Sequence, residues 1–317
     1  MSGRSPRGVV AAILSPEPYR GPPARIWVQA GLILLASVIF GFQFVTFKEA
    51  FKEMGPWTLL ALRALLSLPL MFLMMGWARV PVTVTRASLT RVLVPASLLV
   101  GSHVCFMLGV HRLTAGLTAT LVSMTPIFSV GLSMLFRVER VGLLGIVGSV
   151  IGVAGVAIAT GALNGDVDGI GLALILGSNA FYSLSFIALK QMALRLSSAI
   201  YLIVMMVLSL VVFVPLALAL EGFSVTFTWR AGGSVAYIVI FGQAIAYVAA
   251  LALLRFGGVF QATLLTPLIP VFAISFAILL LGEPLLGREL AGGALIIGGV
   301  VLAIVPLKRG LLARRRA

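Results

Sequence analysis

The chain carries an internal repeat, and this repeat constrains the fold more than any other feature. Residues 121–155 align without a gap on residues 265–299, so that Pro126 coincides with Pro270. Each copy lies within a half that holds five long apolar runs. An odd number of membrane spans forces the second copy to enter the membrane from the opposite side. Two inverted halves around an in-plane two-fold axis are typical of membrane carriers, and the repeat predicts that arrangement here.

The composition indicates a membrane protein built from helices. Hydrophobic residues make up 61% of the chain and charged residues 10%, against about 45–50% and about 25% in soluble domains. The apolar runs are about 20 residues long, enough to cross a hydrocarbon core of roughly 30 Å. Short alternating segments, as in a β-barrel, are absent from the sequence. We therefore expect an all-α polytopic membrane protein.

The apolar runs predict ten transmembrane helices in a 5+5 inverted repeat. Short connections make consecutive spans antiparallel neighbours. The predicted spans are 26–47, 57–77, 92–110, 115–136, 142–159, 169–189, 199–220, 233–254, 259–281 and 285–305.

Four regions follow from these spans. Residues 26–160 form the first five-helix repeat and residues 169–306 the second. Residues 1–25, rich in proline and arginine, are predicted to be a disordered basic cytoplasmic tail, and residues 307–317 a second basic cytoplasmic tail.

The positions of Lys and Arg give the orientation. Of the 23 such residues, one lies within a span (Arg63), and five fall on one side of the membrane (Lys48, Lys52, Arg112, Arg230 and Arg288). The other 17 fall on the opposite side. Because cytoplasmic loops carry the excess of Lys and Arg, both termini are predicted to be cytoplasmic. We expect an integral membrane protein of a bacterial inner (plasma) membrane.

The net charge of +14 needs no nucleic-acid partner, because basic tails at a cytoplasmic surface contact anionic lipid headgroups. The sequence has no CxxC, no HExxH and no phosphate-binding glycine loop after a strand. The single cysteine, Cys105, excludes an internal disulfide. We therefore predict no cofactor, no metal and no enzymatic activity. The expected partners are the lipid bilayer and a small-molecule substrate, with monomer and homodimer both open.

Several motifs together resemble a known family. The first span ends in Phe40-Gly41-Phe42-Gln43, and the second begins with Gly55-Pro56. The fourth carries Thr125-Pro126 followed by Glu139-Arg140, and the ninth carries Ile269-Pro270 followed by Gly282-Glu283-Pro284. The proline-to-glutamate spacing occurs in both halves. Over residues 26 to 307 the chain resembles the EamA family of the drug/metabolite transporter (DMT) superfamily, apart from Phe40, where many members carry Trp.

The resemblance implies ten helices, a 5+5 inverted repeat and movement of small organic metabolites, often outward. Amino acids and their derivatives are frequent substrates in the family. The expected function is therefore a secondary transporter that exports such molecules by alternating access.

Arg63 is the one basic residue within a predicted span, in the half of its helix where the dipole disfavours a cation. An intramembrane cation is costly unless it is paired or hydrated. Arg63 could snorkel, could pair with Glu49, Glu53 or Glu283, or could bind a substrate carboxylate, and the sequence leaves these alternatives open.

The middle of every predicted span lacks Asp and Glu. His103, in the third span, is the titratable residue nearest mid-depth. It could relay protons or simply bond a neighbouring helix. Transport down a gradient is therefore favoured over a proton-coupled multidrug antiporter, which remains an alternative. A non-transport membrane scaffold and a membrane-embedded enzyme are alternatives of another class.

Polar and aromatic side chains on otherwise apolar spans predict a central substrate site. We expect the site to be lined by Phe40, Gln43, His103, Tyr182, Gln243 and Tyr247. Pro126 and Pro270 are predicted hinges, because proline frees a backbone carbonyl and kinks a helix. Glu283 is expected in the first turn of the tenth span. The seventh span, and much of the second, are expected to face lipid.

Overall fold

The computed structural model describes residues 26–79, 85–136, 143–160, 168–192, 198–246, 248–249, 252–253, 268–283 and 286–304. Its named elements are helices. They are α2 (Ile26–Ala50), α3 (Pro56–Ala78), α4 (Arg86–Arg112), α5 (Ala115–Val122), α6 (Thr125–Leu135), α7 (Leu143–Thr160), α8 (Gly169–Met192), α9 (Ser198–Glu221), α10 (Trp229–Tyr237), η2 (Ile238–Ala246), α13 (Ile269–Phe276), η4 (Ala277–Leu281) and α14 (Gly287–Ile304).

Helical segments lie within all ten of the predicted runs. In the described part of the chain, five helical stretches are long and apolar enough to cross a membrane: Trp27–Ala50, Pro56–Ala78, Leu89–Arg112, Ala115–Leu132 and Ile200–Glu221. Three further apolar helices are shorter, at Ile146–Ala159, Gly169–Ser185 and Ile269–Leu281. The described part of the chain is almost entirely helical, as the composition predicts for a membrane protein built from helices.

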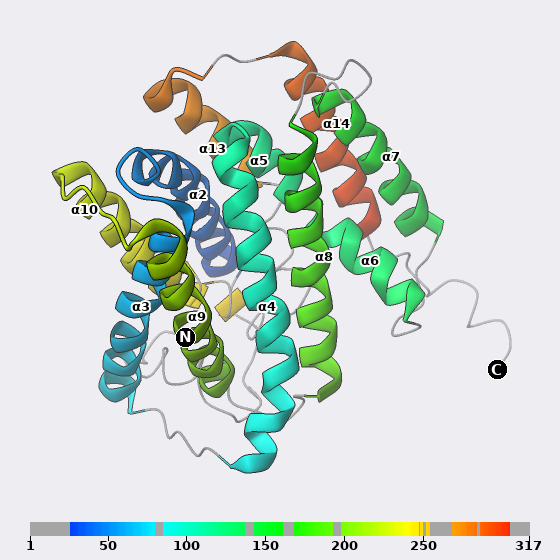
Figure 1. Ribbon diagram of the computed structural model, residues 1–317. Helices are drawn as coiled ribbons and strands as arrows, with labels where there is room; N and C mark the ends of the chain where they lie inside the picture. Colours follow the sequence, from blue (N-terminus) through cyan, green and yellow to red (C-terminus); the bar gives the residue numbers. More distant parts are fainter. Residues whose placement is uncertain are drawn as a thin grey trace, which may run out of the picture.

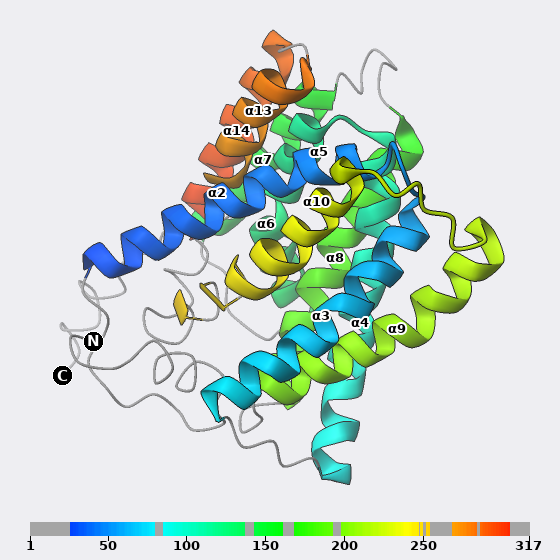
Figure 2. The same ribbon diagram turned by 90° about the vertical axis from the view of Figure 1, so that its left-hand side faces the viewer.

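Helices from the two halves pack in matched pairs (Figures 1 and 2). The pairs α3–α9, α5–α13 and α7–α14 each join corresponding spans of the two repeats. The α4–α8 pair joins the third and sixth spans, and α2 against α10 and η2 joins the first and eighth. The first span corresponds to the sixth and the third to the eighth, so these last two pairs are equivalent when the halves are exchanged. This is the pairing that a two-fold relation between the halves produces.

The predicted fourth span is divided. The helix α5 ends at Val122, and α6 begins at Thr125 with Pro126 at its second position. Proline is tolerated there because the first helical N–H groups have no partner within the helix. Pro270 occupies the same position in α13. Both prolines therefore begin helices, whereas the sequence places Pro126 inside a continuous one.

The predicted eighth span is also irregular. It begins as the α-helix α10 and continues as the π-helix η2. A second π-helix, η4, follows α13 in the ninth span. Wider winding changes which side chains share a face, and π-helical turns occur frequently at functional sites. The hydropathy pattern shows the apolar run and does not reveal this change of winding.

The fifth and tenth spans meet through their glycines. A Cβ atom on Gly299 would overlap the carbonyl oxygen of Gly148, and one on Gly155 would lie 2.8 Å from the carbonyl oxygen of Gly292. The backbones of α7 and α14 therefore touch directly, as small residues allow between helices in a membrane. We call this contact the glycine seam.

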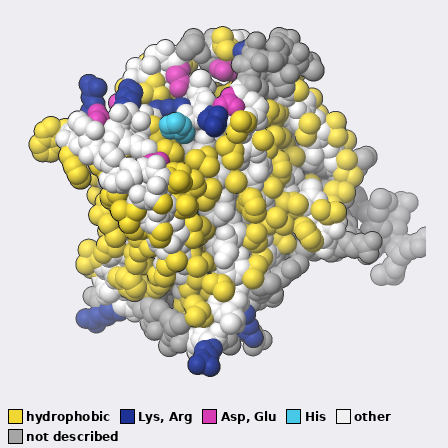
Figure 3. All heavy atoms as spheres, viewed as in Figure 1, with side chains coloured by type: hydrophobic (Ala, Val, Ile, Leu, Met, Phe, Trp, Pro, Cys, Tyr) yellow, Lys and Arg dark blue, Asp and Glu magenta, His cyan; other side chains and the backbone are white. Residues whose placement is uncertain are grey.

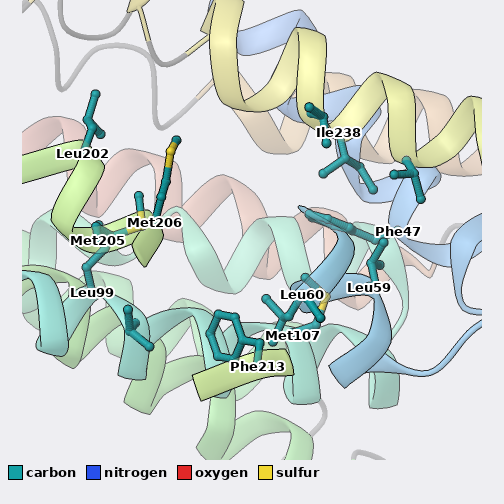
Figure 4. Close-up of a cluster of buried hydrophobic side chains, with 14 of the residues drawn as sticks. Phe47, Leu59, Leu60, Leu99, Met107, Leu202, Met205, Met206, Phe213 and Ile238 are labelled. Atoms are coloured by element: carbon teal, nitrogen blue, oxygen red, sulfur yellow. The ribbon is translucent and has the colours of Figure 1, made fainter. Parts of the chain in front are cut away.

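Figure 3 shows a broad apolar band between two charged ends. In this view the acidic side chains gather at the upper end, together with Lys and Arg. The charged side chains that are visible at the lower end are all Lys or Arg. The interior is packed with large apolar side chains such as Phe47, Leu60, Leu99 and Phe213 (Figure 4). The band is what a protein surrounded by lipid tails requires.

Two carboxylates cap helices from a distance. Glu221, at the end of α9, accepts hydrogen bonds from the N–H groups of Trp57 (3.1 Å) and Thr58 (2.8 Å) at the start of α3. Glu283 accepts from Ala115 (2.9 Å) and Gly116 (3.2 Å) at the start of α5. The sequence assigns Glu283 to the first turn of the tenth span, and this is wrong. Gly282 in the left-handed conformation turns the chain there, and α14 begins later, at Gly287.

Candidate functional site

Three polar side chains from three helices meet inside the molecule. Arg63 of α3 donates hydrogen bonds to Oε1 of Gln243 on η2, from Nε at 3.1 Å and from Nη2 at 2.7 Å. Nη2 also lies 3.3 Å from Nε2 of His103 on α4. All three side chains are less than 10% exposed. We call this set the Arg63 cluster, and it links the first half to the second.

A hydrogen bond between Arg63 and His103 requires one tautomer of the histidine ring. A guanidinium group has N–H donors and no acceptor. If Arg63 and His103 are hydrogen-bonded, Nε2 of the ring must therefore be the acceptor. The ring is then neutral, with its proton on Nδ1. A second proton on Nε2 would place two donors against each other and would break this contact.

A small cavity adjoins the cluster. It contains about 10 Å³ of space open to the centre of a water molecule, which is the scale of a single water. Its lining residues come from α3, α4, α9 and η2: Leu60, Arg63, Ala64, Ser67, His103, Met205, Met206, Ser209, Phe213 and Gln243. The cavity has a polar end at the cluster and apolar walls.

Ser67 is the unsatisfied group of this cavity. Its Oγ atom is buried and has no hydrogen-bond partner among the described residues. The other serine, Ser209, donates to the carbonyl oxygen of Met205 within its own helix, at 2.8 Å. A buried hydroxyl without a partner is costly. The cavity therefore offers a polar atom that a bound molecule could satisfy.

Local sequence explains how the lining is presented. The lining residues of α3 follow one another at the spacing of one helix face: Leu60, Arg63, Ala64 and Ser67. On η2, Gln243 faces Arg63, and the neighbouring residue Gly242 makes room for another side chain. A Cβ there would come within 2.9 Å of the Gln43 amide, so that α2 packs tightly against η2.

The seventh span does not simply face lipid, and here the sequence interpretation is wrong. Met205, Met206 and Phe213 of α9 are almost fully buried and line the cavity, while Val211 and Leu218 on the same helix are exposed. The α3 helix likewise has one buried face and one exposed face. A nearly uniform aliphatic composition hides which face is inward. The polar residues Ser209 and Tyr201, both buried, are the signals that could have shown it.

The predicted site residues are only partly brought together. His103, Gln243 and Arg63 meet in the cluster. Gln43 is buried beside η2 without lining the cavity. Phe40 and Tyr182 are half-buried and pack against the core. Tyr247 lies outside the described residues.

The other polar residues of the sixth span bond neighbouring helices. Ser178 contacts Ser102 at 3.1 Å, and Asn179 donates to the carbonyl oxygen of Leu121 at 2.9 Å. Ser185 donates to the carbonyl oxygen of Pro95 at 2.7 Å. These groups satisfy carbonyl and hydroxyl oxygens between α8 and its neighbours, as buried polar atoms must be satisfied in a membrane protein.

The described residues contain no group of three or more His, Cys, Asp or Glu that could hold a metal ion. The chemistry that the site offers is binding: a guanidinium edge, an amide, a neutral imidazole and a hydroxyl beside apolar walls.

Comparison with known proteins agrees with this arrangement. The solved structures that match include a crystal structure with a TM-score of 0.63 at 18% sequence identity, covering 92% of this chain and 99% of that one. At this identity the likeness shows the fold alone. No match was found among curated proteins. The EamA-like transporter family matches residues 28–161 and 169–305, one match for each half. The chain belongs to this family of membrane transporters, as the resemblance in its sequence predicts.

Proposed function

We propose that this chain is a secondary transporter that exports small organic metabolites, amino acids or their derivatives, by alternating access between two inverted halves. The proposal includes ten transmembrane helices, both termini in the cytoplasm and a bacterial inner membrane. The family, the charge distribution of the sequence and the symmetric pairing of helices support it.

The observation that carries the proposal is the Arg63 cluster with its cavity. Arg63 and His103 belong to the first half, and Gln243 belongs to the second. A polar contact between two halves is broken or remade when they move relative to one another. A cavity at that contact is where a substrate can bind differently in the two states, which alternating access requires.

Pro126 and Pro270 are the hinges in this proposal. Each begins a helix in the corresponding position of its half, so each can let that helix change direction without breaking a regular hydrogen-bond ladder. In the first half, a turn at Ser123 and Met124 immediately precedes α6.

Coupling to protons is not part of the proposal. If His103 carried a proton between the two sides, its Nε2 would have to leave Arg63 each time it was protonated. We propose that substrate moves down its own gradient and that the neutral ring helps to hold Arg63.

Counterflow in liposomes tests the function. Liposomes that contain the purified chain and are loaded with unlabelled L-amino acids should accumulate external labelled amino acid with no pH difference imposed. Empty liposomes are the control. Accumulation that requires an imposed pH gradient and disappears in His103→Asn would favour a proton-coupled antiporter instead. No counterflow of any amino acid would reject the proposed substrates.

A further inference from the structure

The cavity beside Arg63 has the chemistry to bind one particular group. Resting on the proposed function, we infer that the transported molecule is a small carboxylate with an apolar substituent, and that its carboxylate takes the place of the Gln243 amide on Arg63. Ser67 then donates a hydrogen bond to the same carboxylate.

The first support is the geometry at Arg63. Nε and Nη2 form one edge of the guanidinium group, and two parallel N–H groups on such an edge match the two oxygens of a carboxylate. In the structure a single amide oxygen, Oε1 of Gln243, accepts from both, at 3.1 and 2.7 Å. Hydrogen bonds to an ionised acceptor are roughly twice as strong as neutral ones. A carboxylate can therefore compete with this amide for the edge.

The second support is independent of Arg63. Ser67 lies one helical turn further along α3, on the same face. It is 3% exposed, lines the cavity and leaves its hydroxyl without a partner in the described structure. A bound anion next to Arg63 would give that hydroxyl an acceptor. Two donors one turn apart on a helix form a simple anion-binding pair.

The cavity walls indicate the chemistry of the rest of the transported molecule. Leu60, Met205, Met206 and Phe213 face the same space. In this structure the cavity has room for about one water, so an apolar substituent fits only when these walls move apart, which flexible methionine side chains allow. None of the lining residues is acidic, so the walls provide no carboxylate for an ammonium group. The recognised chemistry is thus shared by apolar amino acids and by their deaminated acids.

The exchange also suggests how binding acts on the two halves. Gln243 belongs to the second half, on the π-helix η2, and its contact with Arg63 joins that half to the first. When a carboxylate takes the edge of Arg63, Gln243 is released from it. Substrate binding then removes a contact between the halves, which is a differential interaction of the kind that shifts a conformational equilibrium.

The test uses the full chain in detergent and four matched probes: L-leucine, 4-methylpentanoate, L-leucinamide and L-leucinol. The shift in unfolding temperature is measured against the concentration of each. We expect leucine, 4-methylpentanoate or both to stabilise the protein, and the amide and the alcohol to bind at least about tenfold more weakly, since they lack the charged acceptor. The ratio of the two acids shows whether the amine is recognised.

Gln243→Glu is the decisive variant. It places a permanent carboxylate beside Arg63, so the chain should fold while its binding of both acids falls at least about tenfold. Arg63→Lys keeps the charge without the two-pronged edge and should weaken the acids less than Arg63→Gln. Ser275→Ala, on an exposed serine bonded within its own helix, is the control.

Equal binding of leucine and leucinamide, or undiminished acid binding by Gln243→Glu, would overturn the inference. Because this assay measures binding alone, it is separate from the counterflow experiment. Counterflow of neutral or cationic molecules with no preference for acids would reject the carboxylate site and leave the proposed transport function standing. Acid binding without any flux would support the carboxylate site and reject the proposed transport function.

Discussion

The two halves meet at two very different junctions. At the glycine seam between α7 and α14, backbone touches backbone. At the contact of α3 with α9 and η2, large apolar side chains surround the Arg63 cluster and a cavity. The closest contacts of the seam are between backbone atoms, whereas the cavity is bounded by flexible methionines and exchangeable hydrogen bonds. In the proposed transport cycle we therefore expect the seam to stay in place and the cavity to change.

The largest effect is expected from adding one methyl group to the seam. In Gly299→Ala the new Cβ would overlap the Gly148 carbonyl oxygen and lie 2.7 Å from the Gly152 nitrogen. Because both neighbours are backbone, the helices must separate, at a cost of about 1–3 kcal/mol or more. The adjacent residue is a matched control, since a Cβ on Gly298 meets nothing within 4 Å.

Thermal unfolding of the two variants in the same detergent measures this difference. Gly298→Ala should be as stable as the natural chain or slightly more stable, because alanine favours a helix over glycine. If the two variants unfolded at the same temperature, the close packing of the seam would be refuted.

The next largest effect is expected at the cap that joins α9 to α3. Glu221→Ala removes the acceptor of the Trp57 and Thr58 N–H groups and of the Thr58 hydroxyl, which donates at 2.6 Å. Loss of a capping side chain costs about 0.5–2 kcal/mol. In the control Glu49→Ala, the pair lost with Lys52 is exposed and worth about 0.5 kcal/mol or less. Equal losses of unfolding free energy would contradict the cap.

At Ser67 we expect an opposite effect on stability. Ser67→Ala removes a buried hydroxyl without a partner in the described residues. Since leaving such a group unsatisfied costs about 1–3 kcal/mol, the substrate-free chain should become more stable, by up to about 1 kcal/mol. Binding of the acid probes should weaken at the same time. A loss of stability would mean that the hydroxyl already bonds within the folded protein.

The smallest effect concerns Asp168, outside the spans. Hydrogen bonds from the Gly171 N–H group and from Arg112 lower the pKa of this carboxyl group. A lowered pKa in the folded chain means that the carboxylate stabilises the fold above its unfolded pKa. That contribution is lost as pH falls through the folded pKa. Asp168→Asn should therefore flatten the acid end of the stability profile slightly, and more at low salt.

The sequence predicts the scaffold well, because apolar runs and the repeat are properties of the chain itself. The helical membrane fold and the family are both confirmed. Where the prediction fails, distant contacts decide. Glu283 caps α5 because the chain turns at Gly282, and Met205 and Phe213 face inward because α9 packs on α3. Such facts depend on partners that hydropathy cannot identify.

In the site, too, the sequence identifies some residues and misses the contacts between them. Arg63 and His103 stand out as polar residues in apolar spans, and the sequence identifies both. It cannot pair Arg63 with Gln243, because the π-helical winding of η2 presents that amide. It also does not single out Ser67, since one serine in a membrane helix usually bonds its own backbone.

The central claim is that the cavity junction performs transport, while the seam maintains the fold. Counterflow of labelled leucine by Arg63→Gln in liposomes tests it most directly, with Ser275→Ala as the control and gel filtration as the check on folding. The account predicts that Arg63→Gln elutes as the natural chain does and loses at least about nine-tenths of the flux, because the charged donor of the carboxylate site is removed. Flux equal to that of the natural chain, from a well-folded Arg63→Gln protein, would contradict it.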